Sequence, residues 1–261
     1  MKQTKIVFVA LIALALVATG ALAGATPDAQ KWLDKMVERK NASFRADYTF
    51  DATMAQMGQQ MKISMTGKMM QKDDKHTRME MNTAMTMPGM DEPMIMEMLN
   101  VKDGSTMWMQ IQNPMMGQQV MKLELAKLDH VESSNPMARN LKNADVVGQV
   151  HDLIDKGDFK IAEESADAVT LTAPVTEAML AGFGASMDDL PEDARTVIVV
   201  LDKKNAFPMQ LKVGGAEPML HFRFQNLEFT DAFAAGTFAY SPPEGTSVMD
   251  LSTMMGSMGG Q

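Results

Sequence analysis

Methionine is the residue type in this chain with the widest choice of chemistry. The sequence has 30 methionines and no cysteine among its 261 residues. A thioether sulfur can bind Cu(I), can be oxidised reversibly to the sulfoxide, or can line an apolar surface that accepts partners of different shapes. Exposure separates these uses, because copper and oxidants need sulfurs open to solvent, whereas a carrier needs them in an enclosed space.

Many of these methionines recur at a spacing of two, which is the period of a β-strand. Between residues 54 and 121 the repeats are Met79 and Met81, then Met85 and Met87, then Met94, Met96 and Met98, and finally Met107 and Met109. Side chains alternate across a strand, so each set projects from one face of a sheet. The spacing predicts a methionine face suited to holding something apolar.

The elements that position this face follow from alternating apolar and polar residues. Strands are predicted at 44–54, 61–69, 76–87, 94–99 and 106–112, with turns at 58–59, 73–74 and 103–104. Further strands are predicted at 159–173, 196–202, 209–213 and 219–229, and residues 238–241 could close the sheet.

Four segments have helical signals. Thr26 and Pro27 suit the start of a helix, and Trp32, Leu33 and Met36 make its apolar stripe. Helical spacing also occurs at 122–128, 145–156 and 176–183. We therefore expect a mainly β protein with helices (α+β), in which one large antiparallel sheet has helices available to cover its apolar face.

The period of two also predicts which residues would line a ligand cavity. The predicted lining is Phe50, Met54, Met65, Met69, Met79, Met81, Met96, Met107, Phe222 and Phe224, with Lys62, Lys68, Asp47 and Asp51 on the other face. The predicted lid is the helix at 145–156, whose apolar stripe is Val146, Val150, Leu153 and Ile154.

The N-terminus has the pattern of a secretory signal peptide. Lys2 and Lys5 precede an apolar run at 6–17, and Ala21-Leu22-Ala23 fits signal peptidase cleavage after Ala23. The run is too short for a membrane span, so we expect a soluble protein exported to the periplasm. The expected organisation is a signal peptide at 1–23, one domain at 24–250, and a flexible tail rich in methionine and glycine at 251–261.

Charge and residue spacing argue against several functions. The formal net charge is −9, which disfavours nucleic acid as a partner. His76, His130, His151 and His221 lack ligand spacing, so no metal site and no cofactor are predicted from them. We find no nucleophile with its base and no phosphate-binding glycine loop, so we expect a monomeric binding protein and not an enzyme.

Several short segments, in their order along the chain, resemble the LolA-type outer-membrane lipoprotein carriers. They are SFRADYTF at 43–50, HTRMEM at 76–81, VKDGSTMWMQ at 101–110, LDKKNAFPMQLKV at 201–213, FQNLEF at 224–229 and FAYSPPEGTSVMD at 238–250. The resemblance covers nearly the whole chain after the signal peptide.

The resemblance implies an incomplete antiparallel β-barrel that encloses an apolar cavity and is covered by helices. It also implies a carrier for the acyl chains of lipoproteins or other lipids, which would exchange cargo with membrane-bound donor and acceptor proteins. The family's latch arginine, which holds the closed state, corresponds to Arg78.

The alternative is a periplasmic Cu(I)-binding protein or an oxidant sink. The clusters that could serve are Met85, Met87 and Met90, then Met94, Met96 and Met98, then Met115 and Met116, and in the tail Met254, Met255 and Met258. This reading requires the clusters to be open to solvent.

Overall fold

A computed structural model describes residues 25–39, 41–56, 59–89, 92–114, 117–128, 157–180, 187, 190, 192–215 and 218–253. The predicted signal peptide, the predicted lid helix and most of the predicted tail lie outside these residues. The chain divides into two compact units. Unit 1 comprises residues 1–40 and 132–217, and unit 2 comprises residues 41–131 and 218–261.

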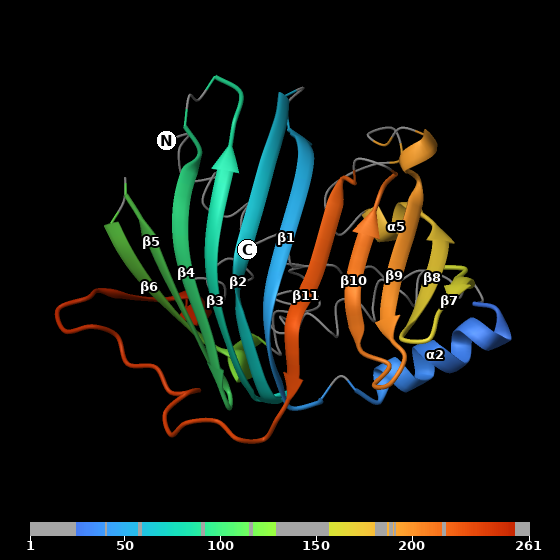
Figure 1. Ribbon diagram of the computed structural model, residues 1–261. Coiled ribbons are helices and arrows are strands. Elements are labelled where there is room, and N and C mark those ends of the chain that lie inside the picture. The colour runs from blue at the N-terminus through green and yellow to red at the C-terminus, as the bar shows by residue number, and fades with distance from the viewer. Residues whose placement is uncertain are drawn as a thin grey trace. The chain divides into compact units, whose positions relative to one another are not determined.

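Unit 2 contains eight neighbouring strands of sheet. In chain order they are β1 (Phe44–Gln56), β2 (Gln59–Asp73), β3 (His76–Thr86), β4 (Met94–Asp103), β5 (Thr106–Asn113), β6 (Gly117–Glu124), β11 (Leu220–Phe229) and β12 (Val248–Asp250). Their order in space is β12-β6-β5-β4-β3-β2-β1-β11. Figure 1 shows β1 to β6 as a curved meander in which neighbours in the chain lie side by side.

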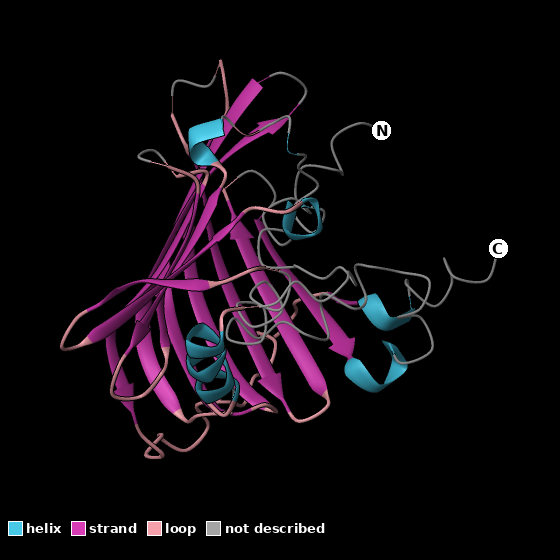
Figure 2. Ribbon diagram, turned by 90° about the vertical axis from the view of Figure 1, so that its right-hand side faces the viewer, coloured by secondary structure: helices cyan, strands magenta, loops and turns pink. Residues whose placement is uncertain are grey.

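The meander of unit 2 arises from local sequence. Asp103 pairs with Thr106 across a two-residue turn, and Gly104 there has a φ of 62°, a conformation that glycine adopts without strain. Asp73 pairs with His76 across a second tight turn. Short turns of this kind force neighbouring strands to be antiparallel, and Figure 2 shows the long strands that result.

A bulge interrupts the pairing of β1 with β11. Arg45 pairs with Glu228 and Asp47 pairs with Gln225, so β11 has one more residue than β1 in this stretch. Asn226 lies in the bulge with a φ of 51°, and its amide donates a hydrogen bond of 2.7 Å to the Asp47 carboxylate. A bulge increases local twist, which adds to the curvature of the sheet.

Unit 1 combines a four-stranded antiparallel meander with short helices. Its elements are α2 (Pro27–Val37), β7 (Lys160–Glu164), β8 (Ala168–Pro174), α5 (Glu177–Leu180), a 3-10 helix η4 (Glu192–Ala194), β9 (Thr196–Asp202) and β10 (Pro208–Val213), with strand order β10-β9-β8-β7. Helix α2 buries Leu33 and Met36 of the predicted stripe, whereas Trp32 is only partly buried and Ala29 is buried in addition. No described helix is long and apolar enough to span a bilayer.

Three sequence predictions of secondary structure were wrong. Residues 122–128 are not an α-helix, because β6 continues to Glu124 and a 3-10 helix η1 (Leu125–Leu128) follows. Met121, Leu123 and Leu125 are buried at the strand period, which overlaps the helical spacing of the same segment. The single strand predicted at 159–173 is the hairpin of β7 and β8.

The third error concerns how the sheet of unit 2 ends. Residues 238–241 form no strand. Instead β12 pairs with β6, and it does so in parallel, with Val248 opposite Val120 and Asp250 opposite Lys122. Every other described strand pairing in unit 2 is antiparallel, as predicted. The correct fold class is therefore mainly β, with large antiparallel sheet and few helices.

Candidate functional site: a methionine-rich buried face

One face of the unit 2 sheet is buried and consists largely of methionine. The described methionines that it buries are Met61, Met65, Met69, Met79, Met81, Met85, Met96, Met98, Met107, Met109 and Met121, each at most 7% exposed. We call this surface the methionine face. Because all of them occupy alternate positions of β2 to β6, the period of two in the sequence gave their orientation correctly.

The strand register brings these methionines into rows across the sheet. Met69 pairs with Met79, Met81 pairs with Met98, and Met109 pairs with Met121. Side chains opposite one another on antiparallel strands lie in contact range, so the sulfurs of different strands form one continuous surface. The methionine face is thus a product of the tertiary register and not of any one strand.

Aromatic residues of β1 and β11 continue the methionine face. Phe44, Tyr48, Phe50, Phe222 and Phe224 are all buried there. The rings of Phe222 and Phe224 lie 4.7 Å apart edge to face, and those of Tyr48 and Phe222 lie 5.9 Å apart and stacked. One end of the buried face is therefore rigid and aromatic, and the rest is flexible thioether.

The predicted cavity lining is brought together by this register. Phe50, Met65, Met69, Met79, Met81, Met96, Met107, Phe222 and Phe224 are all buried on the same face of one sheet. The Met54 backbone pairs with Met61, but its side chain lies outside the described residues, as do the lid residues Val146, Val150, Leu153 and Ile154. A ligand cavity at this face, and a helix that covers it, remain predictions.

Buried polar side chains interrupt the apolar character of the face, namely Tyr48, Gln71, Thr77, Thr83 and Asn113. Thr83 is 0% exposed and Tyr48 is 2% exposed. Among the described residues, the Tyr48 hydroxyl and the Thr83 Oγ1 are buried without a hydrogen-bond partner. Burial raises the pKa of Tyr48 well above its ordinary value, so this hydroxyl remains a proton donor at any physiological pH.

The sequence prediction did not single out either hydroxyl. A signal for Thr83 was present, because it stands at spacing two between Met81 and Met85 and so is a polar residue on an apolar face. The period of two puts Tyr48 on the same face as Phe50, but that its hydroxyl lacks a partner depends on its neighbours in space.

Gly67 allows Tyr48 to lie flat across β2. The two residues are opposite one another, and a Cβ on Gly67 would be 2.9 Å from the Tyr48 hydroxyl and would overlap the backbone oxygen of Glu80 in β3. A contact this short is outside normal packing, so only glycine fits. The Tyr48 hydroxyl consequently lies over β2, the strand next to β3, which carries Thr83.

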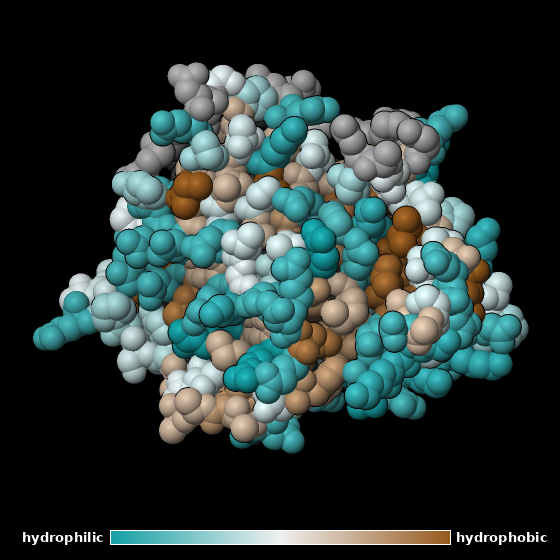
Figure 3. All heavy atoms as spheres, in the orientation of Figure 1, coloured by the Kyte–Doolittle hydropathy of each residue, from teal (hydrophilic) through white to brown (hydrophobic). Residues whose placement is uncertain are grey.

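The opposite face of the same sheet is polar. Lys62, Lys68 and Asp51 are exposed there and Asp47 is partly exposed. A shallow hollow of about 380 Å³ on this face is lined by residues of β1, β2, β3 and β11, including Lys68 and Glu80. Figure 3, in the view of Figure 1, shows hydrophilic residues spread over the visible surface, with apolar ones in separate patches.

A C-terminal segment, residues 230–253, crosses the polar face of β3 to β6. Tyr240 packs on Trp108 with a ring distance of 5.4 Å, and its hydroxyl donates a 2.8 Å hydrogen bond to the Gln110 side chain. Val101 and Val120 are buried although they point to the polar side. The C-terminal segment therefore explains why the simple alternation of buried and exposed residues fails in β4 and β6.

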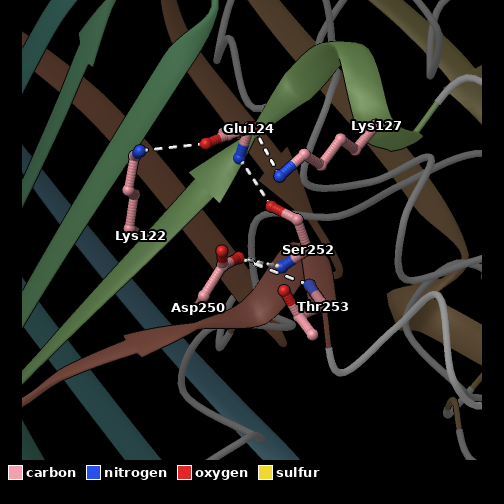
Figure 4. Close-up of polar contacts among 6 residues, drawn as sticks. All are labelled: Lys122, Glu124, Lys127, Asp250, Ser252 and Thr253. Atoms are coloured by element: carbon pink, nitrogen blue, oxygen red, sulfur yellow. Dashed lines mark hydrogen bonds and ion pairs between the residues drawn. The ribbon is translucent and has the colours of Figure 1, made fainter.

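Hydrogen bonds fix the end of the C-terminal segment to β6. The Glu124 backbone N–H donates to the Ser252 hydroxyl at 2.8 Å, and the Glu124 carboxylate accepts from Lys127 and Lys122 (Figure 4). The hydrogen bonds from these two ammonium groups hold the pKa of Glu124 below its ordinary value, and the one from Lys127 has the larger effect. The Asp250 carboxylate accepts from the backbone N–H groups of Ser252 and Thr253.

Arg78, the predicted latch, lies on the polar face beside the C-terminal segment. Its Nε donates to Glu80 at 2.8 Å and its Nη1 donates to the backbone oxygen of Thr237 at 3.4 Å. Its described contacts are thus with its own strand, β3, and with the C-terminal segment. Since the predicted lid lies outside the described residues, a latch to that helix stays a prediction.

A small ionic group occupies the turn between β2 and β3. The Asp73 carboxylate accepts from the Lys75 N–H at 2.9 Å and lies 2.7 Å from the His76 ring nitrogen. Slight burial favours the protonated acid, but these hydrogen bonds and the His76 charge outweigh it, so the pKa of Asp73 is lowered. The Asp103 carboxylate is 3.6 Å from the other ring nitrogen of His76.

The described part of the chain offers little to a metal ion. It contains no group of three or more histidine, aspartate or glutamate side chains that could hold one. Of the predicted copper clusters, Met85, Met96 and Met98 are buried and Met87 and Met94 are partly exposed. Met90, Met115, Met116, Met254, Met255 and Met258 lie outside the described residues.

Comparisons with known proteins give likenesses in structure only. No family model matches the chain, and no curated protein is similar to it in sequence. Similar solved structures include an uncharacterized conserved protein from Thermus thermophilus, at 9% identity and a TM-score of 0.39 over 85% of this chain and 99% of that chain. MucB is similar at 15% identity and a TM-score of 0.41, over 83% and 64% of the two chains.

A LolA superfamily protein from Nitrosomonas europaea is also among the similar structures. It has 12% identity and a TM-score of 0.29, over 81% of this chain and 97% of that chain.

Proposed function

We propose that the protein is an exported, periplasmic binding protein or carrier for acyl-chain lipids or lipoproteins, and that the methionine face is its binding surface. The observation that carries this proposal is the concentration of buried methionines on one face of one sheet. An ordinary core needs only apolar bulk, whereas thioether side chains repack around ligands of different shape at small cost.

Burial of the described methionines argues for a carrier over a copper binder or oxidant sink. Copper or oxidants must reach the sulfur, but Met65, Met79 and Met81 are 1–5% exposed. For a ligand to enter, the cover of the methionine face must move. We propose that the helix at 145–156 provides this cover, and that membrane-bound proteins load and unload the cargo.

The experiment that tests the proposal is displacement of a fluorescent fatty-acyl probe, paired with Cu(I) titration. Replacing Met65, Met79 and Met81 together by leucine conserves volume roughly and should cost less than about 1.5 kcal/mol per site. We expect the triple variant to fold and to bind the probe. A narrower range of acyl-chain lengths should displace the probe from this variant than from the wild type.

The matched control is Met249→Leu, because Met249 is 46% exposed and pairs with β6 at the sheet edge. The same range of acyl chains should displace the probe from this variant as from the wild type. A wild-type protein that binds Cu(I) tightly and ignores the probe would contradict the proposal. Native mass spectrometry of protein purified from the periplasm should then detect copper in place of a lipid.

A further inference from the structure

We infer that Tyr48 and Thr83 form a polar anchor within the methionine face, and that it binds the carbonyl oxygen of a neutral acyl ester or amide. The inference rests on the proposed function and specifies its ligand class. Its starting point is the pair of buried hydroxyls without a hydrogen-bond partner among the described residues.

The position of the two hydroxyls suits one ligand group. Tyr48 and Thr83 lie in adjacent rows of the sheet, since Tyr48 is opposite Gly67 and Gly67 is opposite Met81, while Met65 is opposite Thr83. The Tyr48 side chain extends over Gly67, so its hydroxyl lies in the row of Gly67 and Met81, next to the row of Thr83. Both groups can therefore approach the same point beside Met81.

The chemistry of the hydroxyls selects the ligand. A buried hydroxyl without a partner is costly, and a native protein keeps it where a bound group can satisfy it. Both hydroxyls can donate, and a carbonyl oxygen has two lone pairs to accept from them. The pKa of Tyr48 is raised, so the phenol does not ionise when a ligand excludes water.

Charge argues for a neutral carbonyl and against an ionised carboxylate. Lys62, Lys68 and Arg78 belong to the polar face, on the opposite side of the sheet from Thr83. Among the described strand residues, Lys102 is the cation that points to the methionine face, but it pairs with Thr77 and Met107 and lies four residues along β4 from Met98, the partner of Met81. It therefore belongs to a more distant row than Tyr48 and Thr83. Burying an ionised carboxylate there would cost its full free energy of desolvation, because no cation lies beside it. An ester or amide, as at the head of an acyl chain, is neutral and costs much less to bury.

The test uses two lipids that differ only in the carbonyl. They are 1-palmitoyl-lysophosphatidylcholine, which has an ester, and 1-O-hexadecyl-lysophosphatidylcholine, which has an ether, both titrated below their micelle concentrations. We expect the wild type to prefer the ester about tenfold, the effect of roughly one good hydrogen bond.

The variants Tyr48→Phe and Thr83→Val remove one hydroxyl each and keep the side-chain shape. Each should lower affinity for the ester about five- to tenfold and leave affinity for the ether unchanged. Without ligand, each should unfold at the same temperature as the wild type or higher, because a buried unpaired hydroxyl is gone. Thr66→Val, an exposed position of β2, is the matched control and should change neither affinity.

Thr83→Ser keeps a hydroxyl and should retain the preference for the ester. This variant shows whether a loss of preference in Thr83→Val comes from the missing hydroxyl or from a change in folding. Equal affinity of the wild type for ester and ether would overturn the anchor while leaving the proposed lipid-binding function intact. Equal weakening of both lipids by the variants would also overturn it, since the hydroxyls would then act only through packing. Failure of both lipids to bind would overturn the proposed function itself.

Discussion

Gly67→Ala tests the close approach of Gly67 in β2 to the β3 backbone and to the Tyr48 hydroxyl. The shape of the methionine face depends on this approach. The added Cβ would lie 3.0 Å from the carbonyl carbon of Glu80 and 2.9 Å from the Tyr48 hydroxyl, and would overlap the Glu80 oxygen. Two of these three atoms belong to the backbone of β3, which cannot rotate away as a flexible side chain could. Strand β3 must move, or Tyr48 and β2 must separate from it.

The cost can be worked out from these contacts. Overpacking a well-packed site costs roughly 1–3 kcal/mol. Displacing β3 would also weaken ladder hydrogen bonds beside the Gly67 and Met81 pair, at about 1 kcal/mol each. We therefore expect a loss of about 3 kcal/mol in the free energy of unfolding of unit 2, and a fall of roughly 6–12 °C in Tm.

The assay is urea unfolding followed by tryptophan fluorescence. The chain has two tryptophans, of which Trp32 belongs to unit 1 and Trp108 to unit 2. In a Trp32→Phe background the fluorescence change reports on unit 2 alone. The matched control is Thr66→Ala, the exposed neighbour of Gly67 in β2, which should change stability by at most about 0.5 kcal/mol. If Gly67→Ala proves no more destabilising than this control, the close packing of β2 against β3 and Tyr48 is refuted.

Two further predictions concern the polar side of unit 2. Because the pKa of Asp73 is lowered in the folded protein, its stabilising contribution is present above the ordinary value of 3.8 and is lost as pH falls through the folded pKa. Urea midpoints of the wild type should therefore fall more steeply below about pH 4 than those of Asp73→Asn, and parallel curves would contradict this. Tyr240→Phe removes the hydrogen bond to Gln110 and should cost about 1 kcal/mol. Hydrogen exchange of the amides around Tyr240 should rise, and unchanged protection would show that the bond does not hold the C-terminal segment in place.

The sequence by itself determined the local elements and their faces. The strand period of Met61, Ile63, Met65 and Met69 needed no knowledge of a partner strand, because side chains alternate in any extended chain. The turn at Gly104 was likewise a local property. From these features the methionine face, its aromatic continuation and the predicted lining could be placed on one side of a meander before the structure was known.

Only the tertiary structure decided features that depend on residues distant in the chain. Val101 and Val120 are buried on the polar side because a segment more than a hundred residues later covers them. The parallel pairing of β12 with β6 and the contacts of Arg78 arise in the same way. The unpartnered hydroxyls of Tyr48 and Thr83 belong here too, since a hydrogen bond is missing only relative to everything packed nearby. Periodicity reports what one strand prefers, but which side chain meets which is set by contacts that the local pattern does not encode.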